Sequence, residues 1–196
     1  MRHLYPLRFE PTFRRYIWGG RRLETVLHKP IGPGDDYAES WEVVDHGEDQ
    51  SRVARGPLAG TSLRELVEQH NEELFGKHAP GDQFPLLFKL LECNRNLPVQ
   101  LPPHAEQGAK LDPPDLGKTE AWVILAAEPG SVIYAGLNDG VDRDSLASAV
   151  SNGRTEDCLH KIHPQAGDCV FIPAGTVHAL GEGLLVAEIQ QASDTT

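Results

Sequence analysis

Short apolar runs separated by turn residues dominate the pattern of hydrophobic and polar positions along the chain. The runs that are apolar or rich in β-formers cover residues 84–92, 120–128, 131–137, 168–175 and 183–191. Gly, Pro, Asn or Asp separates most of them, as between strands. Several runs are apolar at nearly every position, which is typical of strands covered on both faces. The pattern predicts a mainly β protein, a sandwich or barrel with a few helices outside it.

Two other stretches have helical periodicity. Within residues 60–76, Ser62 is followed three residues later by Glu65, the sequence pattern of a capping box. The helical face that follows consists of Leu63, Leu66, Val67, His70 and Leu74. A second stretch, 141–154, has an Asp near its start and Gly153 beyond its end. We expect both helices to be structural.

Charge and composition exclude several classes of partner. The formal net charge is −11 with no long basic run, which argues against nucleic acid and anionic membranes. A small anionic substrate is still compatible, because one or two local cations suffice. No stretch approaches the roughly 20 apolar residues of a membrane span, and the N-terminus lacks a signal-peptide core. The three cysteines include no CxxC pair and suit reduced thiols, so we expect a cytoplasmic protein.

The most specific motif is the stretch GDCVFIPAGTVHAL, residues 167–180. It has the spacing G-x5-P-x-G-x2-H, in which Pro173 ends strand pairing and Gly175 turns the chain before His178. This spacing resembles the second motif of the cupin jelly rolls, where that histidine is a metal ligand. An isolated strand histidine is more often an ordinary core or surface residue, but the spacing favours the ligand interpretation.

A second motif, GKTEAWVI, covers residues 117–124. Glu120 opens an apolar strand, where a buried carboxylate is costly without a cation. In a continuous strand Lys118 would share its face with Glu120. The alternative is a Lys–Glu pair exposed to water at the mouth of a strand.

Five stretches together, in order along the whole chain, resemble the type I mannose-6-phosphate isomerases in their short bacterial form. They are YIWGG (16–20), ESWEVVDHG (39–47), FPLLFKLLE (84–92), GKTEAWVI (117–124) and the segment 172–196. The resemblance implies a cupin jelly-roll fold and the interconversion of mannose 6-phosphate and fructose 6-phosphate. A small-molecule sugar phosphate would be the partner; the oligomeric state is not predicted.

The resemblance also implies a metal site. In that family a Gln, a His two residues later, a Glu in the Gly-Lys-Thr-Glu motif and a distant His hold one divalent metal, normally zinc. Gln100, Glu120 and His178 match these positions. Such a mixed oxygen and nitrogen site suits zinc, with manganese, iron or cobalt as alternatives.

The second ligand position departs from the family. Pro102 stands where the histidine is expected, and His104 follows two residues later. In a continuous strand His104 would lie on the same face but roughly 6–7 Å further along, whereas a zinc–nitrogen bond is about 2.0–2.1 Å. A kink at the two prolines could bring His104 into the site. The alternatives are a three-residue site, an empty pocket, and a plain surface turn.

Lys118 is the candidate catalytic cation, near the phosphate or a developing oxyanion. The sequence assigns no general base. The family continues beyond Asp-Thr-Thr with an arginine and a C-terminal domain, so we expect a single cupin-type domain over residues 1–196 without that domain. One competing function is a non-catalytic or degenerate cupin that binds a sugar phosphate. Another is an iron dioxygenase, but such an enzyme usually needs more histidines around the metal than this sequence places there.

Overall fold

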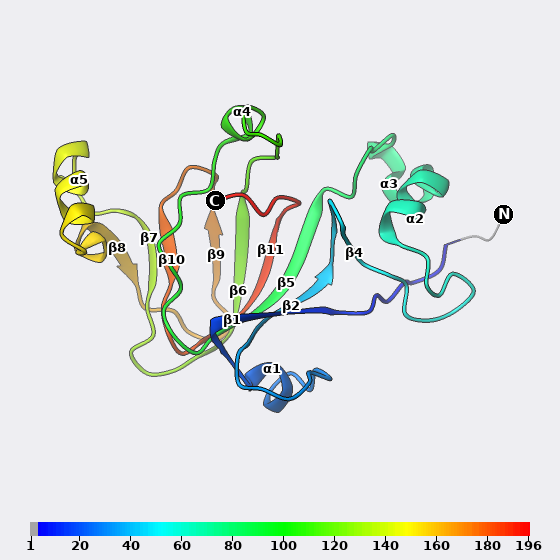
Figure 1. The fold of residues 1–196 in the computed structure, drawn as a ribbon, viewed down its shortest axis with the longest axis horizontal. Helices are drawn as coiled ribbons and strands as arrows, with labels where there is room; N and C mark the ends of the chain where they lie inside the picture. The colour runs from blue at the N-terminus through cyan, green and yellow to red at the C-terminus, as the bar shows by residue number, and fades with distance from the viewer. Residues whose placement is uncertain (1–3) are drawn as a thin grey trace.

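The computed structural model describes residues 4–196 and arranges them as antiparallel sheets with helices at the periphery (Figure 1). The strands are β1 (Thr12–Gly20), β2 (Tyr37–Val43), β3 (Asp45–His46), β4 (Asp49–Gln50), β5 (Leu86–Cys93), β6 (Glu120–Ala127), β7 (Ile133–Leu137), β8 (Leu159–Ile162), β9 (Cys169–Ile172), β10 (His178–Leu180) and β11 (Leu184–Gln191). The helices are α1 (Arg22–Thr25), α2 (Leu63–Gln69), α3 (Asn71–Phe75), α4 (Ala105–Gly108) and α5 (Arg143–Ser151), with 3₁₀ turns at Gly76–His78 and Thr155–Cys158.

The larger sheet has six strands in the order β1-β2-β5-β11-β6-β9. A smaller sheet has the order β10-β7-β8, and β3 pairs with β4. The five apolar runs predicted as strands become β5, β6, β7, β9 and β11. The prediction of a mainly β, cupin-like architecture with peripheral helices is therefore confirmed.

The main core lies between the two sheets. Since successive strand residues point to opposite faces, every second side chain of the larger sheet points toward the smaller one. The buried residues that pack together include Leu91, Trp122, Ile124 and Val186 from the larger sheet and Ile133 and Leu180 from the smaller sheet. Their contact holds the two sheets face to face, as in a β-sandwich.

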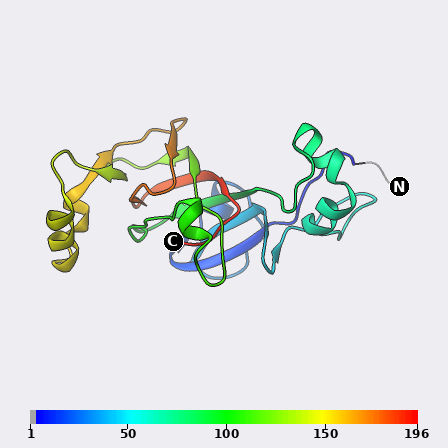
Figure 2. The same cartoon turned by 90° about the horizontal axis from the view of Figure 1, so that it is seen from above.

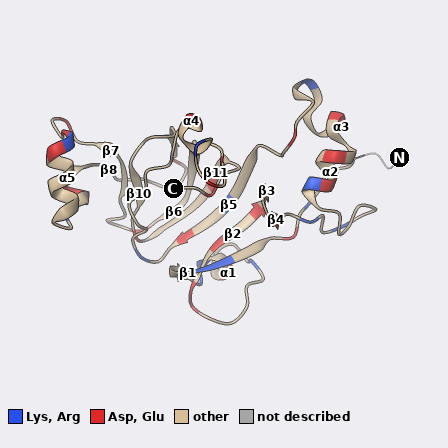
Figure 3. Ribbon diagram, turned by 45° about the horizontal axis from the view of Figure 1, so that its top comes forward, with Lys and Arg blue, Asp and Glu red and all other residues tan. Residues whose placement is uncertain are grey.

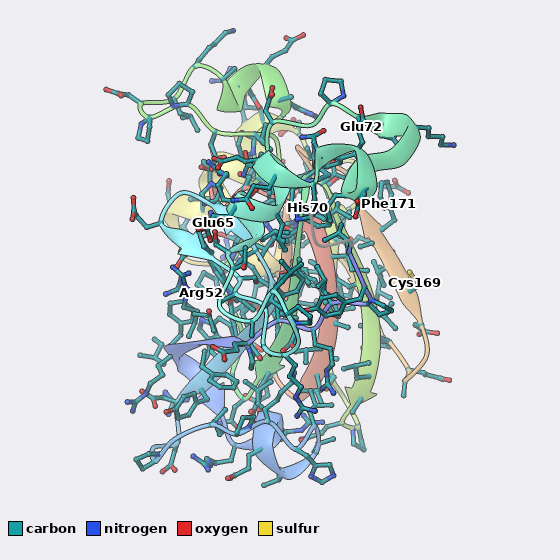
Figure 4. The ribbon with its side chains drawn as sticks, turned by 90° about the vertical axis from the view of Figure 1, so that its right-hand side faces the viewer. Arg52, Glu65, His70, Glu72, Cys169 and Phe171 are labelled. Carbon is teal, nitrogen blue, oxygen red and sulfur yellow. The ribbon has the colours of Figure 1, made fainter. Side chains whose placement is uncertain are left out.

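The outward face of the larger sheet is apolar but partly open, so the prediction of strands covered on both faces is wrong there. Phe171 is 65% exposed, Ile189 43% and Val123 36%. The strand register places Phe171, Ala121 and Ile189 in one row across β9, β6 and β11. Figure 4 shows Phe171 and Cys169 on β9, which is the edge strand of this sheet. The apolar pattern alone does not distinguish this face from a covered one.

All three cysteines lie in the described part of the chain and are free thiols. Cys93 and Cys158 are buried, whereas Cys169 is exposed. Burial raises the pKa of the Cys93 thiol, which favours its protonated form.

The predicted capping box starts α2. The Ser62 hydroxyl accepts a hydrogen bond from the Glu65 amide at 3.2 Å, and the Glu65 carboxylate accepts one from the Ser62 amide at 2.7 Å. The predicted helical face contains the buried residues Leu63, Leu66 and Val67. Leu63 and Leu66 belong to a buried cluster that also includes N-terminal residues and Val43 of β2, which holds α2 beside the end of the large sheet.

The predicted single helix is divided into α2 and α3. The side-chain amide of Asn71 donates hydrogen bonds to the carbonyl of Val67 at 3.0 Å and to the carbonyl of Gly81 at 2.6 Å. Because the side chain takes the carbonyl that would accept the backbone N–H of residue 71 in a continuous helix, the two helices are separate.

The second predicted helix, within residues 141–154, is α5, and the Asp142 carboxylate accepts a hydrogen bond from the Ser145 amide at 2.8 Å. Seen from above, α5 and the pair α2–α3 lie at opposite ends of the molecule (Figure 2). The ribbons of α2, α3 and α5 carry charged residues, and most strand residues are uncharged (Figure 3). No helix within residues 4–196 is long and apolar enough to cross a membrane.

Candidate active site

A cavity of about 220 Å³ opens on the inward face of the larger sheet. Side chains from β1, β2, β5, β6, β10 and β11 line it. The predicted site residues that line it are Gln100, Lys118, Glu120 and His178. The fold therefore brings together four of the five residues predicted from the sequence.

Gln100 and His178 are held side by side by their backbones. The amide of Gln100 donates to the carbonyl of His178 at 2.8 Å, and the amide of His178 donates to the carbonyl of Gln100 at 2.9 Å. Two residues that exchange both hydrogen bonds lie directly opposite each other in an antiparallel bridge, with side chains on the same face. The second cupin-like motif therefore places its histidine next to Gln100.

Lys118 and Glu120 form a buried ion pair at the start of β6. Lys118 Nζ lies 2.9 Å from Glu120 Oε1, and the two side chains are 7% and 1% exposed. The exposed-pair alternative is thus wrong. The second carboxylate oxygen of Glu120 accepts a hydrogen bond from Trp122 Nε1 at 3.1 Å. Glu120 Oε1, despite its proximity to Lys118, makes no hydrogen bond of normal geometry within residues 4–196.

The two ring nitrogens of His178 have different neighbours: Nδ1 lies beside a backbone carbonyl, and Nε2 lies beside the Glu120 carboxylate. Its Nδ1 lies 3.0 Å from the carbonyl oxygen of Thr176, which can only accept, so Nδ1 carries the proton. Nε2 then has its lone pair free, 3.7 Å from Glu120 Oε2. Burial lowers the pKa of His178, which favours the neutral ring. A neutral imidazole with one nitrogen fixed by a carbonyl is the usual form of a metal-binding histidine.

Glu188 on β11 is a functional candidate that the sequence interpretation missed. Its carboxylate accepts a hydrogen bond from Trp122 Nε1 at 3.0 Å, so one indole N–H serves both Glu188 and Glu120. Burial, together with the charge of Glu120, raises the pKa of Glu188 to about 7. The signal was present, since Glu188 is a carboxylate within an otherwise apolar run, as Glu120 is at the start of one.

Lys89 on β5 is a second cavity residue that the sequence interpretation missed. Its Nζ lies 3.8 Å from Glu39 Oε2 and 3.4 Å from Asp194 Oδ1, and 4.7 Å from the centre of the Trp41 ring. Burial by itself lowers the pKa of Lys89, but the surrounding carboxylates outweigh it and raise the pKa above its ordinary value. Lys89 is therefore a charged residue of the cavity lining.

The charge and donor set of the cavity fit one divalent cation. Its lining includes four carboxyl groups and two lysines, a formal excess of two negative charges with His178 neutral. Glu120 Oε1 is buried without a hydrogen bond, and His178 Nε2 lies 3.7 Å from the other oxygen of the same carboxylate, Oε2. Within residues 4–196, however, no three His, Cys, Asp or Glu side chains form a metal-binding cluster, so a set of three protein ligands here needs a donor of another type. Gln100, which lines the same cavity, carries such a donor in its amide oxygen.

His104 lies apart from the other four residues. It is exposed, it immediately precedes α4, and it is not among the residues that line the cavity. No strand covers positions 100–104 and α4 begins at Ala105, so the continuous strand face expected for positions 100 and 104 does not form. The His104 ring instead occupies the space beside Gly175, where a Cβ would come within 2.1 Å of its Nε2.

Known proteins resemble this chain in sequence. A family profile described as Phosphomannose isomerase type I, catalytic domain, matches residues 6–129. Mannose-6-phosphate isomerase ManA of Bacillus subtilis is 37% identical over 191 residues, which cover 97% of this chain and 59% of that protein. Mannose-6-phosphate isomerase of Streptococcus mutans is 36% identical over 191 residues, with the same coverage of both chains. The chain thus spans 59% of the length of both relatives.

Solved structures agree with the sequence comparisons. The crystal structure of mannose 6-phosphate isomerase from Bacillus subtilis has a TM-score of 0.89 at 35% identity, over 97% of this chain and 59% of that one. A putative mannosephosphate isomerase from Archaeoglobus fulgidus has a TM-score of 0.81 at 25% identity, over 96% of this chain and 62% of that one. With the profile matching more than half of its residues, the chain belongs to the type I phosphomannose isomerase family.

Proposed function

We propose that this cavity is the centre of a metal-dependent aldose–ketose isomerase that interconverts mannose 6-phosphate and fructose 6-phosphate. The observation that carries the proposal is the meeting of Gln100, Glu120 and His178 in one cavity. Membership of the family, which implies a divalent metal, and the names of its relatives support the substrate class. The single domain over residues 1–196 and the cytoplasmic location stay predictions.

Gln100, Glu120 and His178 would hold the cation, through the amide oxygen, the carboxylate and Nε2. Zinc is the proposed metal, and manganese, iron and cobalt accept the same donor types. Three protein ligands would leave a position open for water or substrate, as in catalytic sites. When bound, the cation supplies Lewis-acid stabilisation of negative charge on the sugar oxygens.

The reaction requires a proton to move between C1 and C2 of the sugar through an enediol, and Glu188 is our candidate for the group that moves it. Its carboxyl is buried in the cavity wall, and a pKa near the working pH suits a group that both takes and returns a proton. Lys118 is our candidate for the cation that donates a hydrogen bond to the developing oxyanion.

The test is a coupled mannose-6-phosphate assay combined with metal analysis of the purified chain. We expect a bound divalent metal and measurable turnover. The variants Glu120→Gln and His178→Ala should each lose metal and at least about 100-fold in turnover, because each removes a ligand. The matched controls Glu68→Gln and His160→Ala change exposed residues outside the cavity and should behave as the parent chain.

Unchanged activity in either ligand variant would eliminate the proposed site. The alternative is a sugar-phosphate-binding cupin without turnover, and the proline at position 102 is the observation that favours it. That alternative predicts binding of mannose 6-phosphate in calorimetry with no product in the coupled assay.

A further inference from the structure

We propose that residues 102–105 form a brace between the two segments that carry Lys118 and His178, with His104 as a positioning residue and not a metal ligand. The role of the brace in metal binding rests on the proposed function of the cavity. The contacts of the brace are seen in the structure and do not depend on that proposal. Each contact lies between segments that are far apart in sequence.

One side of the brace holds the turn before His178. The carbonyl of Pro102 accepts a hydrogen bond from the amide of Gly175 at 2.9 Å. Two residues earlier, Gln100 exchanges two backbone hydrogen bonds with His178. The segments 100–102 and 175–178 therefore run together, and the position of His178 is fixed from both ends of this pairing.

The other side of the brace holds the residues that lead into β6. The carbonyl of Pro103 accepts a hydrogen bond from the amide of Lys118 at 3.3 Å. Gly117 packs directly on the backbone of Ala105, since a Cβ at Gly117 would lie 2.7 Å from the Ala105 nitrogen. The carbonyls of Pro102 and Pro103 thus accept hydrogen bonds from two different segments, those of Gly175 and Lys118.

The His104 ring completes the contact with the turn before His178. A Cβ on Gly175 would come within 2.1 Å of His104 Nε2 and 2.5 Å of its Cε1, so the ring fills the place of the missing side chain. Gly175 also has φ +81°, which disfavours other residues. The ring limits the movement of a turn that has no side chain of its own at this position.

The two prolines suit this role. Their ring-locked φ angles restrict the free chain, so less conformational entropy is lost when the brace forms. A proline lacks an N–H, and in this segment the prolines contribute carbonyl oxygens only. Pro102 stands where the family has a histidine ligand. This segment would therefore lack that ligand and instead help to position the proposed ligands Gln100 and His178.

Two substitutions at one position separate the roles of His104. His104→Phe keeps a flat ring against Gly175 but cannot bind a metal, whereas His104→Ala removes both properties. We would titrate the metal-free chain and both variants with zinc chloride against a chromophoric competitor. We expect about tenfold weaker zinc binding for His104→Ala, a size known for residues that orient ligands, and binding within about twofold of the parent for His104→Phe. His160→Ala, at an exposed histidine, is the control.

Hydrogen exchange provides a readout that needs no metal. The amides of Gly175 and Lys118, which the brace binds, should exchange faster in His104→Ala and at the parent rate in His104→Phe. Equal loss of zinc binding in both variants would identify His104 as a ligand and overturn the proposal. No change in binding or exchange for His104→Ala would overturn it as well. If the parent chain binds no zinc, the proposed function fails, while the exchange data still decide the brace.

Discussion

At the scale of single residues, the main feature of the cavity is a set of buried carboxylates with few hydrogen-bond donors around them. One indole N–H, that of Trp122, binds both Glu120 and Glu188, and the ammonium of Lys118 lies beside Glu120. The sequence predicts His178 from a motif of specific spacing, and Glu120 from its place at the start of an apolar strand together with the family resemblance. It does not predict Lys89, whose burial depends on Glu39 and Asp194, partners 50 and 105 residues away.

Glu188 should make the unfolding free energy of the metal-free chain depend on pH. Its pKa is about 7 in the folded chain and about 4.3 in an unfolded chain, so the folded state binds the extra proton between these values. The unfolding free energy of the metal-free chain should therefore fall as pH rises from about 4.3 to 7, by on the order of 3 kcal/mol. Urea denaturation with a chelator at pH 5 and pH 8 measures this difference.

Glu188→Gln, which keeps an acceptor for Trp122, should lose most of that pH-dependent difference. Glu68→Gln, at an exposed position, should retain it. An identical pH profile for the parent chain and Glu188→Gln would contradict the assignment.

At the scale of elements, local patterns predict a strand where apolar residues dominate a short segment, and a helix where they recur with helical period. The five apolar runs and both periodic stretches satisfy this condition. The pattern does not predict β2, because its seven residues include two glutamates, Glu39 and Glu42. Glu39 is nevertheless buried, and it contacts Lys89 and Trp41. The pattern also misses the break at Asn71, since the partner Gly81 lies in a loop ten residues away.

The cap of α2 allows a prediction at this scale. Ser62→Ala removes the side-chain acceptor of the Glu65 amide, so we expect the unfolding free energy to fall by about 1 kcal/mol. Ser62→Thr is the conservative control and should lose less. Zinc binding should be unchanged in both variants, because α2 contributes no residue to the cavity lining. Chemical denaturation and zinc titration measure the two properties.

At the scale of the whole molecule, Asp115 joins three distant segments. Its carboxylate accepts hydrogen bonds from Ser193 Oγ at 3.0 Å and Thr195 Oγ1 at 2.6 Å, and lies 3.3 Å from His46 Nε2. These contacts hold the segment with Asp194 over the loop that leads to β6. They span about 70 to 80 residues, so no local pattern could predict them.

Asp115→Asn should weaken the hydrogen bonds of Asp115 and so lower the unfolding free energy. Burial raises the pKa of Asp115, but the hydrogen bonds outweigh it and keep the pKa below its ordinary value. The ionised form therefore contributes stability above about pH 4, and this contribution is lost as pH falls through the folded-state pKa. We expect about 1–2 kcal/mol less stability at pH 7 and a smaller difference from the parent chain at pH 3, measured by denaturation. A constant difference at both pH values would refute the role of the charge.

The distribution of the cysteines has a practical consequence. Of the three thiols, all in the described part of the chain, Cys93 and Cys158 are buried and Cys169 alone is open to solvent, beside Phe171 on the edge strand. The native chain thus carries one ready attachment point for a maleimide-linked fluorophore, outside the cavity lining. A dye there would report on whatever approaches the apolar face of the sheet, with no engineered residue.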